Sequence, residues 1–105
     1  MSQFTVYKNP NPDSKDSYPY LLDVQNNLLN SLNTQVVVPM CYLSSINKRH
    51  LTNVSPIFKI KGRNCVMLTP QLAAIPQTDL GSSVTDLSEN RSEIIAALDF
   101  LITGF

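Results

Sequence analysis

The stretch SENRSEIIAALDFLITGF, residues 88–105, is the clearest structural element of the sequence. Its apolar residues recur every three to four positions, the spacing of a helix face that packs on a core. Asp86 and Glu89 form a D-x-x-E pattern typical of a helix start, with Ser88 as an alternative cap. A helix that runs to the chain end is therefore predicted. Its core-facing stripe consists of Ile94, Ile95, Leu98, Leu101, Ile102 and Phe105.

The end of this helix is expected to contact something besides the core. No Lys or Arg follows Arg91, so no cationic side chain complements the negative end of the helix dipole. Phe100 falls off the apolar stripe, and the chain stops at Phe105. The pattern therefore predicts a helix end without a cap, free to meet a partner.

Length and composition predict a single domain over residues 1–105. The formal net charge is zero and only 15% of residues are charged, which argues against non-specific binding to nucleic acid or acidic membranes. No apolar run approaches the roughly 20 residues that span a bilayer. The N-terminus, MSQFTVYK, lacks the pattern of a signal peptide, so a cytoplasmic protein is expected. Cys41 and Cys65 lie in apolar runs and are predicted to be buried free thiols.

Alternating or β-branched runs predict the strands, and turn residues separate them. The most apolar run, QVVVPMCYL, should form a central strand with a bulge or bend at Pro39. Residues 61–64, KGRN, should join two strands as a hairpin. Residues 69–76 are expected to cross back over the sheet, and residues 77–85 to form a loop. The predicted strands are residues 3–8, 18–25, 35–43, 56–60 and 65–68. The fold class is thus a small, mostly antiparallel sheet or partial barrel with one C-terminal helix.

Three loop regions have two interpretations each. Residues 9–17, NPNPDSKDS, form either an ordinary hairpin loop or a contact loop. Leu28, Leu29 and Leu32 either tuck under the polar segment 26–34 or are exposed for contact. Residues 44–55 contain Lys48, Arg49 and His50, which form a solvated turn or a site for an anion or partner.

No motif predicts chemistry. The chain has one His and two well-separated cysteines without a C-x-x-C pair, so no metal site is expected. His50 has no flanking signature of a catalytic triad. Three glycines cannot build a phosphate-binding loop. The residues therefore indicate a binding protein without catalytic residues, metal or cofactor.

The order and spacing of short sequence pieces over almost the whole chain resemble the CcdB family of bacterial toxins. No single piece is specific, but from Pro56 onward the spacing is free of gaps. The matching pieces are Gln3-Phe4, Val6-Tyr7, Asp23-Val24-Gln25, Val37 to Pro39, Pro56, Ile60, Gly62, Met67, Thr69, Ala73, Pro76, Asp86-Leu87-Ser88 and Gly104.

The resemblance implies an SH3-like partial barrel with a small accessory sheet and a C-terminal helix, assembled as a homodimer. It implies a toxin without catalytic activity that binds the A subunit of DNA gyrase and traps gyrase on cleaved DNA. It also implies a cognate antitoxin whose disordered C-terminal segment folds along the toxin. It implies further that toxin and antitoxin together repress their operon and that the toxin contacts DNA only through the antitoxin.

The resemblance also implies a gyrase-binding surface at the helix end, together with two leucines from the loop after the second strand. Thr103 stands where the best-known member has tryptophan, and Asp99 replaces an amide. The expected surface consists of Leu28, Leu29, Asp99, Ile102, Thr103, Gly104 and Phe105. Residues 9–16 and 44–47 are the expected antitoxin contacts.

Two other functions remain open. A MazF-type endoribonuclease shares the expected fold but needs a catalytic arginine beside an acid–base partner. Arg49, Arg63 and Arg91 are the arginines of the chain. A non-toxic SH3-like dimeric binding module is the other alternative.

Overall fold

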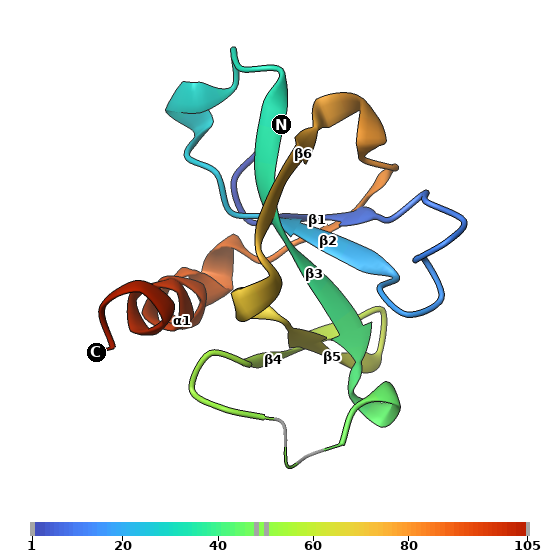
Figure 1. Cartoon of the computed structure of the whole chain (residues 1–105), viewed down its shortest axis with the longest axis vertical. Helices are drawn as coiled ribbons and strands as arrows, with labels where there is room; N and C mark the ends of the chain where they lie inside the picture. The colour runs from blue at the N-terminus through green and yellow to red at the C-terminus, as the bar shows by residue number, and fades with distance from the viewer. Residues whose placement is uncertain (1, 48, 50, 105) are drawn as a thin grey trace.

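In the computed structural model, which describes residues 2–47, 49 and 51–104, the longest strand organises the sheet. This strand, β3 (Thr34–Tyr42), pairs antiparallel with β2 (Tyr20–Asp23) along one side. On its other side, the first half of β3 pairs with β6 (Ala73–Pro76) and the second half with β5 (Arg63–Met67). Figure 1 shows β3 as one continuous ribbon, with β6 beside its upper part and β4 and β5 at its lower end.

The remaining strands extend this sheet at both edges. β4 (Ile57–Ile60) lies outside β5, while β1 (Thr5–Lys8) and β7 (Ser83–Asp86) follow β2. Within the described residues the order is β4-β5-β3-β2-β1-β7, and every pairing is antiparallel. A single α-helix, α1 (Arg91–Thr103), follows the sheet in the described part of the chain. The predicted fold class, mostly β with one C-terminal helix, is therefore confirmed.

Of the bulge or bend predicted at Pro39, the bulge is absent, because β3 keeps its register with β2 through this residue. The Pro39 carbonyl accepts a hydrogen bond from the Leu68 N–H at 3.0 Å, so it faces the β5–β6 side. Pairing with β6 ends at Val37 and pairing with β5 begins at Met40. Pro39 lies between these two pairings. The absence of its N–H therefore removes no hydrogen bond between β3 and either strand. The register shift lies instead between Val6 and Tyr7, opposite β7.

The predicted hairpin between β4 and β5 is confirmed, with a shorter turn than expected. Ile60 pairs with Arg63, which leaves two loop residues. These residues, Lys61 (φ 50°) and Gly62 (φ 80°), both have positive φ, as a type I′ turn requires. Arg63 and Asn64 already belong to β5.

Two segments that were expected to be irregular are strands. β6 lies in the predicted crossing segment, and β7 overlaps the predicted loop. Both are four residues long, and Pro76 ends β6 at its pairing with Thr34. Their own sequences carry weak strand signals, and pairing with long-range partners decides their conformation.

The core lies between the sheet and the first half of α1. Ile94 is fully buried and Ala97 almost so, whereas Ile102 is 77% exposed. The predicted stripe was correct at Ile94 and wrong at Ile102, and Phe105 lies outside the described residues. Ile95, Leu98 and Leu101 are half-buried. The central cluster consists of Phe4, Val6, Leu22, Val38, Met40, Phe58, Ile60, Cys65, Met67, Leu87 and Ile94.

The ends of α1 differ from the predicted caps. The helix begins at Arg91, directly after a 3₁₀ turn, η6 (Ser88–Asn90). The Asp86 carboxylate, before this turn, accepts a hydrogen bond from the Ser88 N–H at 2.7 Å. At the other end, Gly104 has φ 80° and donates its N–H to the Phe100 carbonyl at 2.9 Å. The helix is therefore closed by a left-handed glycine cap, and the prediction of an uncapped end was wrong.

Candidate functional site

The leucine loop, residues 26–33, presents apolar side chains to solvent. Leu28 is 87% exposed, and Leu29 and Leu32 are each 48% exposed. Residues Asn27–Leu29 form a 3₁₀ turn, η1, which the Asn26 side chain caps by accepting from the Leu28 N–H at 2.9 Å. Of the two interpretations of these leucines, the exposed one is correct.

Beneath the loop lies a polar cluster, here called the glutamine network: the buried Asp23, Gln25 and Gln35 and the half-buried Gln77. The Asp23 carboxylate is fully buried and accepts from the Gln35 side-chain amide through both oxygens, at 3.0 and 2.9 Å. It also accepts from the Gln25 N–H at 2.9 Å. Burial raises the pKa of the Asp23 carboxyl, and these hydrogen bonds oppose that effect. Sequence analysis missed this cluster, because no shared sequence pattern joins Asp23 to Gln35 or Gln77.

The helix end, residues 99–104, is the second exposed apolar region. Ile102 is 77% exposed and Phe100 37% exposed. The Thr103 hydroxyl donates to the Asp99 carbonyl at 2.7 Å, which occupies the hydroxyl within the last turn. Asp99, Thr103 and Gly104 are also exposed. The predicted contact residue Phe105 lies outside the described residues.

The structure brings the predicted gyrase-binding residues together in two groups rather than one. Leu28 and Leu29 are neighbours in η1, and Asp99, Ile102, Thr103 and Gly104 are neighbours in the helix end. Figure 1 shows the leucine loop at the upper left and the end of α1 below it, well separated in the view. A single chain therefore does not join the two groups into one surface.

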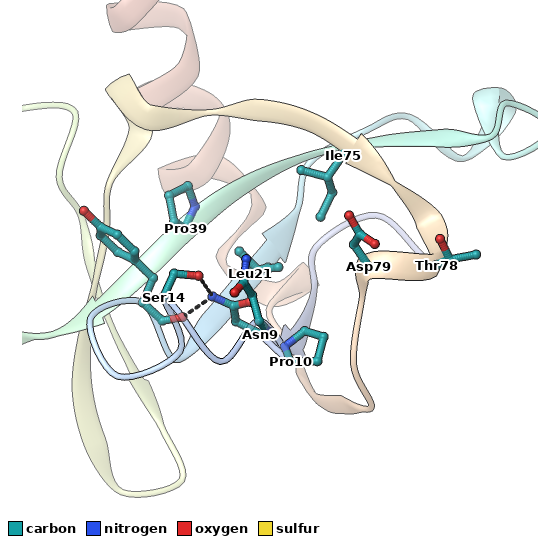
Figure 2. A pocket seen from close by; sticks show the side chains of 10 residues that line it. Asn9, Pro10, Ser14, Leu21, Pro39, Ile75, Thr78 and Asp79 are labelled. Carbon is teal, nitrogen blue, oxygen red and sulfur yellow. Dashed lines mark hydrogen bonds between the residues drawn. The ribbon is translucent and has the colours of Figure 1, made fainter.

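A pocket of about 440 Å³ opens on another part of the molecule. Residues of the β1–β2 loop line it, with Leu21 and Pro39, and Ile75, Thr78 and Asp79 complete it (Figure 2). The loop is ordered, because the Asn9 side-chain amide donates to the Ser14 hydroxyl at 3.0 Å and to the Tyr18 carbonyl at 2.9 Å. In Figure 1 this loop extends to the right, on the side away from α1.

A neighbouring pocket of about 380 Å³ shares Tyr18 with the first. Asp16 and Ser17 line it on one side, and Ser45 and Ile46 on another. Parts of the two expected antitoxin-contact segments, residues 9–16 and 44–47, therefore lie along adjoining hollows. Asp79 and Ile75 were missed by sequence analysis, because both belong to segments that carried no clear structural signal.

The arginines are the candidates for the alternative nuclease function. The Arg63 guanidinium carbon lies 3.5 Å from the centre of the Tyr42 ring, which in turn meets Tyr20 edge-on at 6.0 Å. Burial and the hydrogen bond to Tyr42 raise the pKa of Tyr20 to about 12. The raised pKa makes the Tyr20 phenol a weaker candidate for a general base than an ordinary tyrosine. Arg91 lies 5.4 Å from the Phe4 ring.

The two cysteines are free and buried, as predicted. Burial raises the pKa of both thiols, which disfavours the reactive thiolate. Over residues 2–47, 49 and 51–104, no group of three or more His, Cys, Asp or Glu is arranged to hold a metal ion. Lys48 and His50 of the predicted basic turn lie outside these ranges. In the same part of the chain, no helix has the length and apolar content to cross a membrane.

Comparison with solved structures identifies similar folds among toxins. An endoribonuclease in complex with its cognate antitoxin, from a mycobacterial species, matches with a TM-score of 0.73 at 15% identity. The match covers 97% of this chain and 94% of that one. The Mycobacterium tuberculosis toxin MazF-mt6 matches with a TM-score of 0.64 at 14% identity, over 78% of this chain and 83% of that one. At these identities the likeness establishes the fold alone.

The sequence itself matches a protein family over nearly its full length. The family is described as CcdB protein, and the match covers residues 3–104. That range includes every β-strand of the described residues and the whole of α1. The chain therefore belongs to the CcdB family of toxin–antitoxin toxins.

Proposed function

We propose that this toxin acts without catalysis, as a homodimer that binds the A subunit of DNA gyrase and traps gyrase on cleaved DNA. The observation that carries the proposal is the exposure of apolar side chains at the expected contact positions. Leu28 is 87% exposed and Ile102 is 77% exposed. Complete burial of such a side chain stabilises a complex by about 1.5–3 kcal/mol.

A homodimer accounts for the separation of the two exposed groups. A two-fold axis beside the helix end would place two copies of Ile102 and Thr103 next to each other. Each half of the resulting surface would then be bordered by a leucine loop. The αL cap at Gly104 supports this role, because a closed helix end keeps Ile102 and Thr103 in a defined geometry.

A cognate antitoxin is the second proposed partner. The adjoining pockets beside Tyr18 suit an extended peptide segment, since together they form a hollow with Leu21, Pro39 and Leu68 among its lining residues. The β1–β2 loop, whose residues line the first pocket, lies on the side away from α1 (Figure 1), which supports separate sites for antitoxin and gyrase. In this scheme the antitoxin neutralises the toxin in the cytoplasm and holds the operator DNA during repression.

RNA cleavage is the second candidate function, and the fold shared with endoribonucleases favours it. The arrangement of Arg63 argues against it, because this guanidinium stacks on Tyr42 and the raised pKa of the neighbouring Tyr20 makes that phenol a poor general base. Incubation of the purified protein with RNA separates the two candidates. Cleavage in the absence of gyrase would support the nuclease and contradict the gyrase proposal.

The gyrase proposal is tested by binding to the dimerisation region of the gyrase A protein and by accumulation of cleaved plasmid. Leu28→Ser and Ile102→Thr should each weaken binding at least tenfold. Leu72→Ser and Ile57→Thr are matched controls, because these side chains are also exposed apolar groups, 36% and 40% respectively, outside the proposed surface. Equal losses in both pairs, or no binding by the unmodified protein, would contradict the proposal.

A further inference from the structure

Gln77 ties the leucine loop to a segment 45 residues further along the chain. Its side-chain amide donates to the Leu32 carbonyl at 2.8 Å and to the Asn30 carbonyl at 3.3 Å. Its backbone N–H donates to the Asn33 carbonyl at 2.9 Å. Gln77 begins the 3₁₀ turn η5 (Gln77–Asp79), which directly follows β6. One residue therefore supplies donors to three carbonyls of the loop.

Gln25 supports the loop from the other side. Its side-chain amide lies 3.2 Å from the Leu29 carbonyl and 3.3 Å from the Thr34 carbonyl. Its side-chain oxygen accepts from the Val36 N–H at 3.0 Å. Glutamine donors thus reach the backbone at both ends of the leucine-bearing segment.

The Asp23 carboxylate determines which way these amides point. Both oxygens of the Asp23 side chain accept from the Gln35 amide, so the Gln35 nitrogen faces Asp23. The Gln35 oxygen consequently faces the opposite way, 3.1 Å from the Gln77 amide nitrogen and 3.4 Å from that of Gln25. A single buried acceptor therefore sets the direction of the whole glutamine network.

Packing of the leucines cannot provide this support. Leu28 is 87% exposed, and Leu29 and Leu32 are each about half exposed. A loop without buried apolar anchors loses conformational entropy when it binds a partner, unless its backbone is already held. The hydrogen bonds from the glutamine network hold that backbone.

We infer that Gln77, acting with Gln25, Gln35 and Asp23, is a positioning residue that preorganises the leucine loop for its partner. The inference rests on the proposed function, in which this loop contacts gyrase. Gln77 itself need not touch the partner. Its amide fixes the backbone from which Leu28 and Leu29 project.

Hydrogen exchange in the free protein tests the positioning role without gyrase. Gln77→Met retains the length of the side chain and removes the amide. It should accelerate exchange of the Leu29, Asn30 and Leu32 amides at least tenfold, while amides between β3 and β5 remain unchanged. Gln71→Met makes the same chemical change on an exposed 3₁₀ turn and should leave the loop amides unchanged. Unchanged loop amides in Gln77→Met, or equal acceleration throughout the sheet, would overturn the inference.

A double-mutant cycle with a fragment of gyrase A tests whether Gln77 acts through the leucines. Gln77→Met should weaken binding about tenfold when it is the only substitution. It should weaken binding less than twofold when Leu28→Ala and Leu29→Ala are already present. Equal factors in both backgrounds would overturn the inference. If the unmodified protein does not bind the fragment, the proposed function fails and the exchange experiment alone decides the role of Gln77.

Discussion

The two halves of α1 have similar apolar content but opposite environments. In the first half, Ile94 and Ala97 are buried against the sheet. In the second half, Ile102 is 77% exposed and Phe100 37% exposed. The helix continues past the edge of the structure that covers it, as Figure 1 shows at the left of the molecule. An apolar stripe therefore identifies a helix, but the extent of the sheet decides which part of the stripe is core.

The leucine loop and the helix end differ in the way their exposed side chains are supported. The loop backbone accepts hydrogen bonds from the Gln25 and Gln77 side chains, which the buried Gln35 contacts in turn. The helix end is closed by one backbone hydrogen bond from Gly104 and one side-chain bond from Thr103. Tertiary contacts thus support the loop, whereas local contacts support the helix end.

Replacing the same residue type in both halves of α1 should give the largest contrast. Ile94→Ala should lower the free energy of unfolding by about 2–5 kcal/mol, because it leaves a cavity in a closed core. Ile102→Ala should change it by less than about 0.5 kcal/mol, since that side chain is already in solvent. Urea unfolding measures both values. Similar losses at the two positions would contradict the division of the helix.

Comparison with Asp23→Asn tests whether the buried Asp23 carboxyl beneath the loop makes the stability of the protein depend on pH. The folded-state pKa of Asp23 is raised above its ordinary value of 3.8, so the native protein holds this proton to higher pH than the unfolded chain. This linkage stabilises the protein below pH 3.8 and is lost as pH rises through the raised pKa. The unfolding free energy of the unmodified protein, minus that of Asp23→Asn, should therefore fall by at most about 1.4 kcal/mol per pH unit in that window.

Urea unfolding of both proteins from about pH 3.5 upward measures this difference. Asp13→Asn removes an exposed carboxyl without altering Asp23, so it should retain the pH dependence of Asp23. A difference between Asp23→Asn and the unmodified protein that rises with pH would show a lowered pKa and contradict the prediction.

Thr103→Trp tests whether the helix end contacts gyrase. The exposed position accepts a large side chain, and tryptophan often dominates the energy of an interface. Affinity for the gyrase A fragment should rise about tenfold, equal to about 1.4 kcal/mol, with little change in stability. Calorimetric titration measures the affinity. Ala96→Trp, which changes another exposed position of α1, is the control. A gain at both positions would indicate a non-specific aromatic effect.

The smallest contrast compares two glycines with the same backbone conformation. Gly62 and Gly104 both have φ 80°, and a Cβ at either position would meet no atom within 4 Å. Substitution by alanine therefore adds conformational strain of about 1 kcal/mol at each. Gly62→Ala should show this loss in global unfolding, because the turn sets the β4–β5 pairing. Gly104→Ala should show less, since the last helical turn can unwind locally. A larger loss at Gly104 would contradict local support of the helix end.

Much of the fold was predictable from residue patterns. Alternation and turn residues correctly located the hairpin around Gly62, and the apolar spacing located α1. β6 and β7 were not predicted, because their short sequences become strands only by pairing with β3 and β1. The predicted leucine and helix-end residues are exposed apart from Phe105, which lies outside the described residues. Their contact with gyrase stays a prediction.

The sequence by itself determined the family, the C-terminal helix and the residue types available for binding, because these depend on local order and spacing. Only the tertiary structure decided which apolar residues are core, since burial depends on what lies across from each side chain. It also decided the environment of Asp23, which joins Gln35 and, through it, Gln77. Residues so distant in sequence carry no shared pattern, and only the pairing of β3 with β2 and β6 brings them within hydrogen-bonding distance.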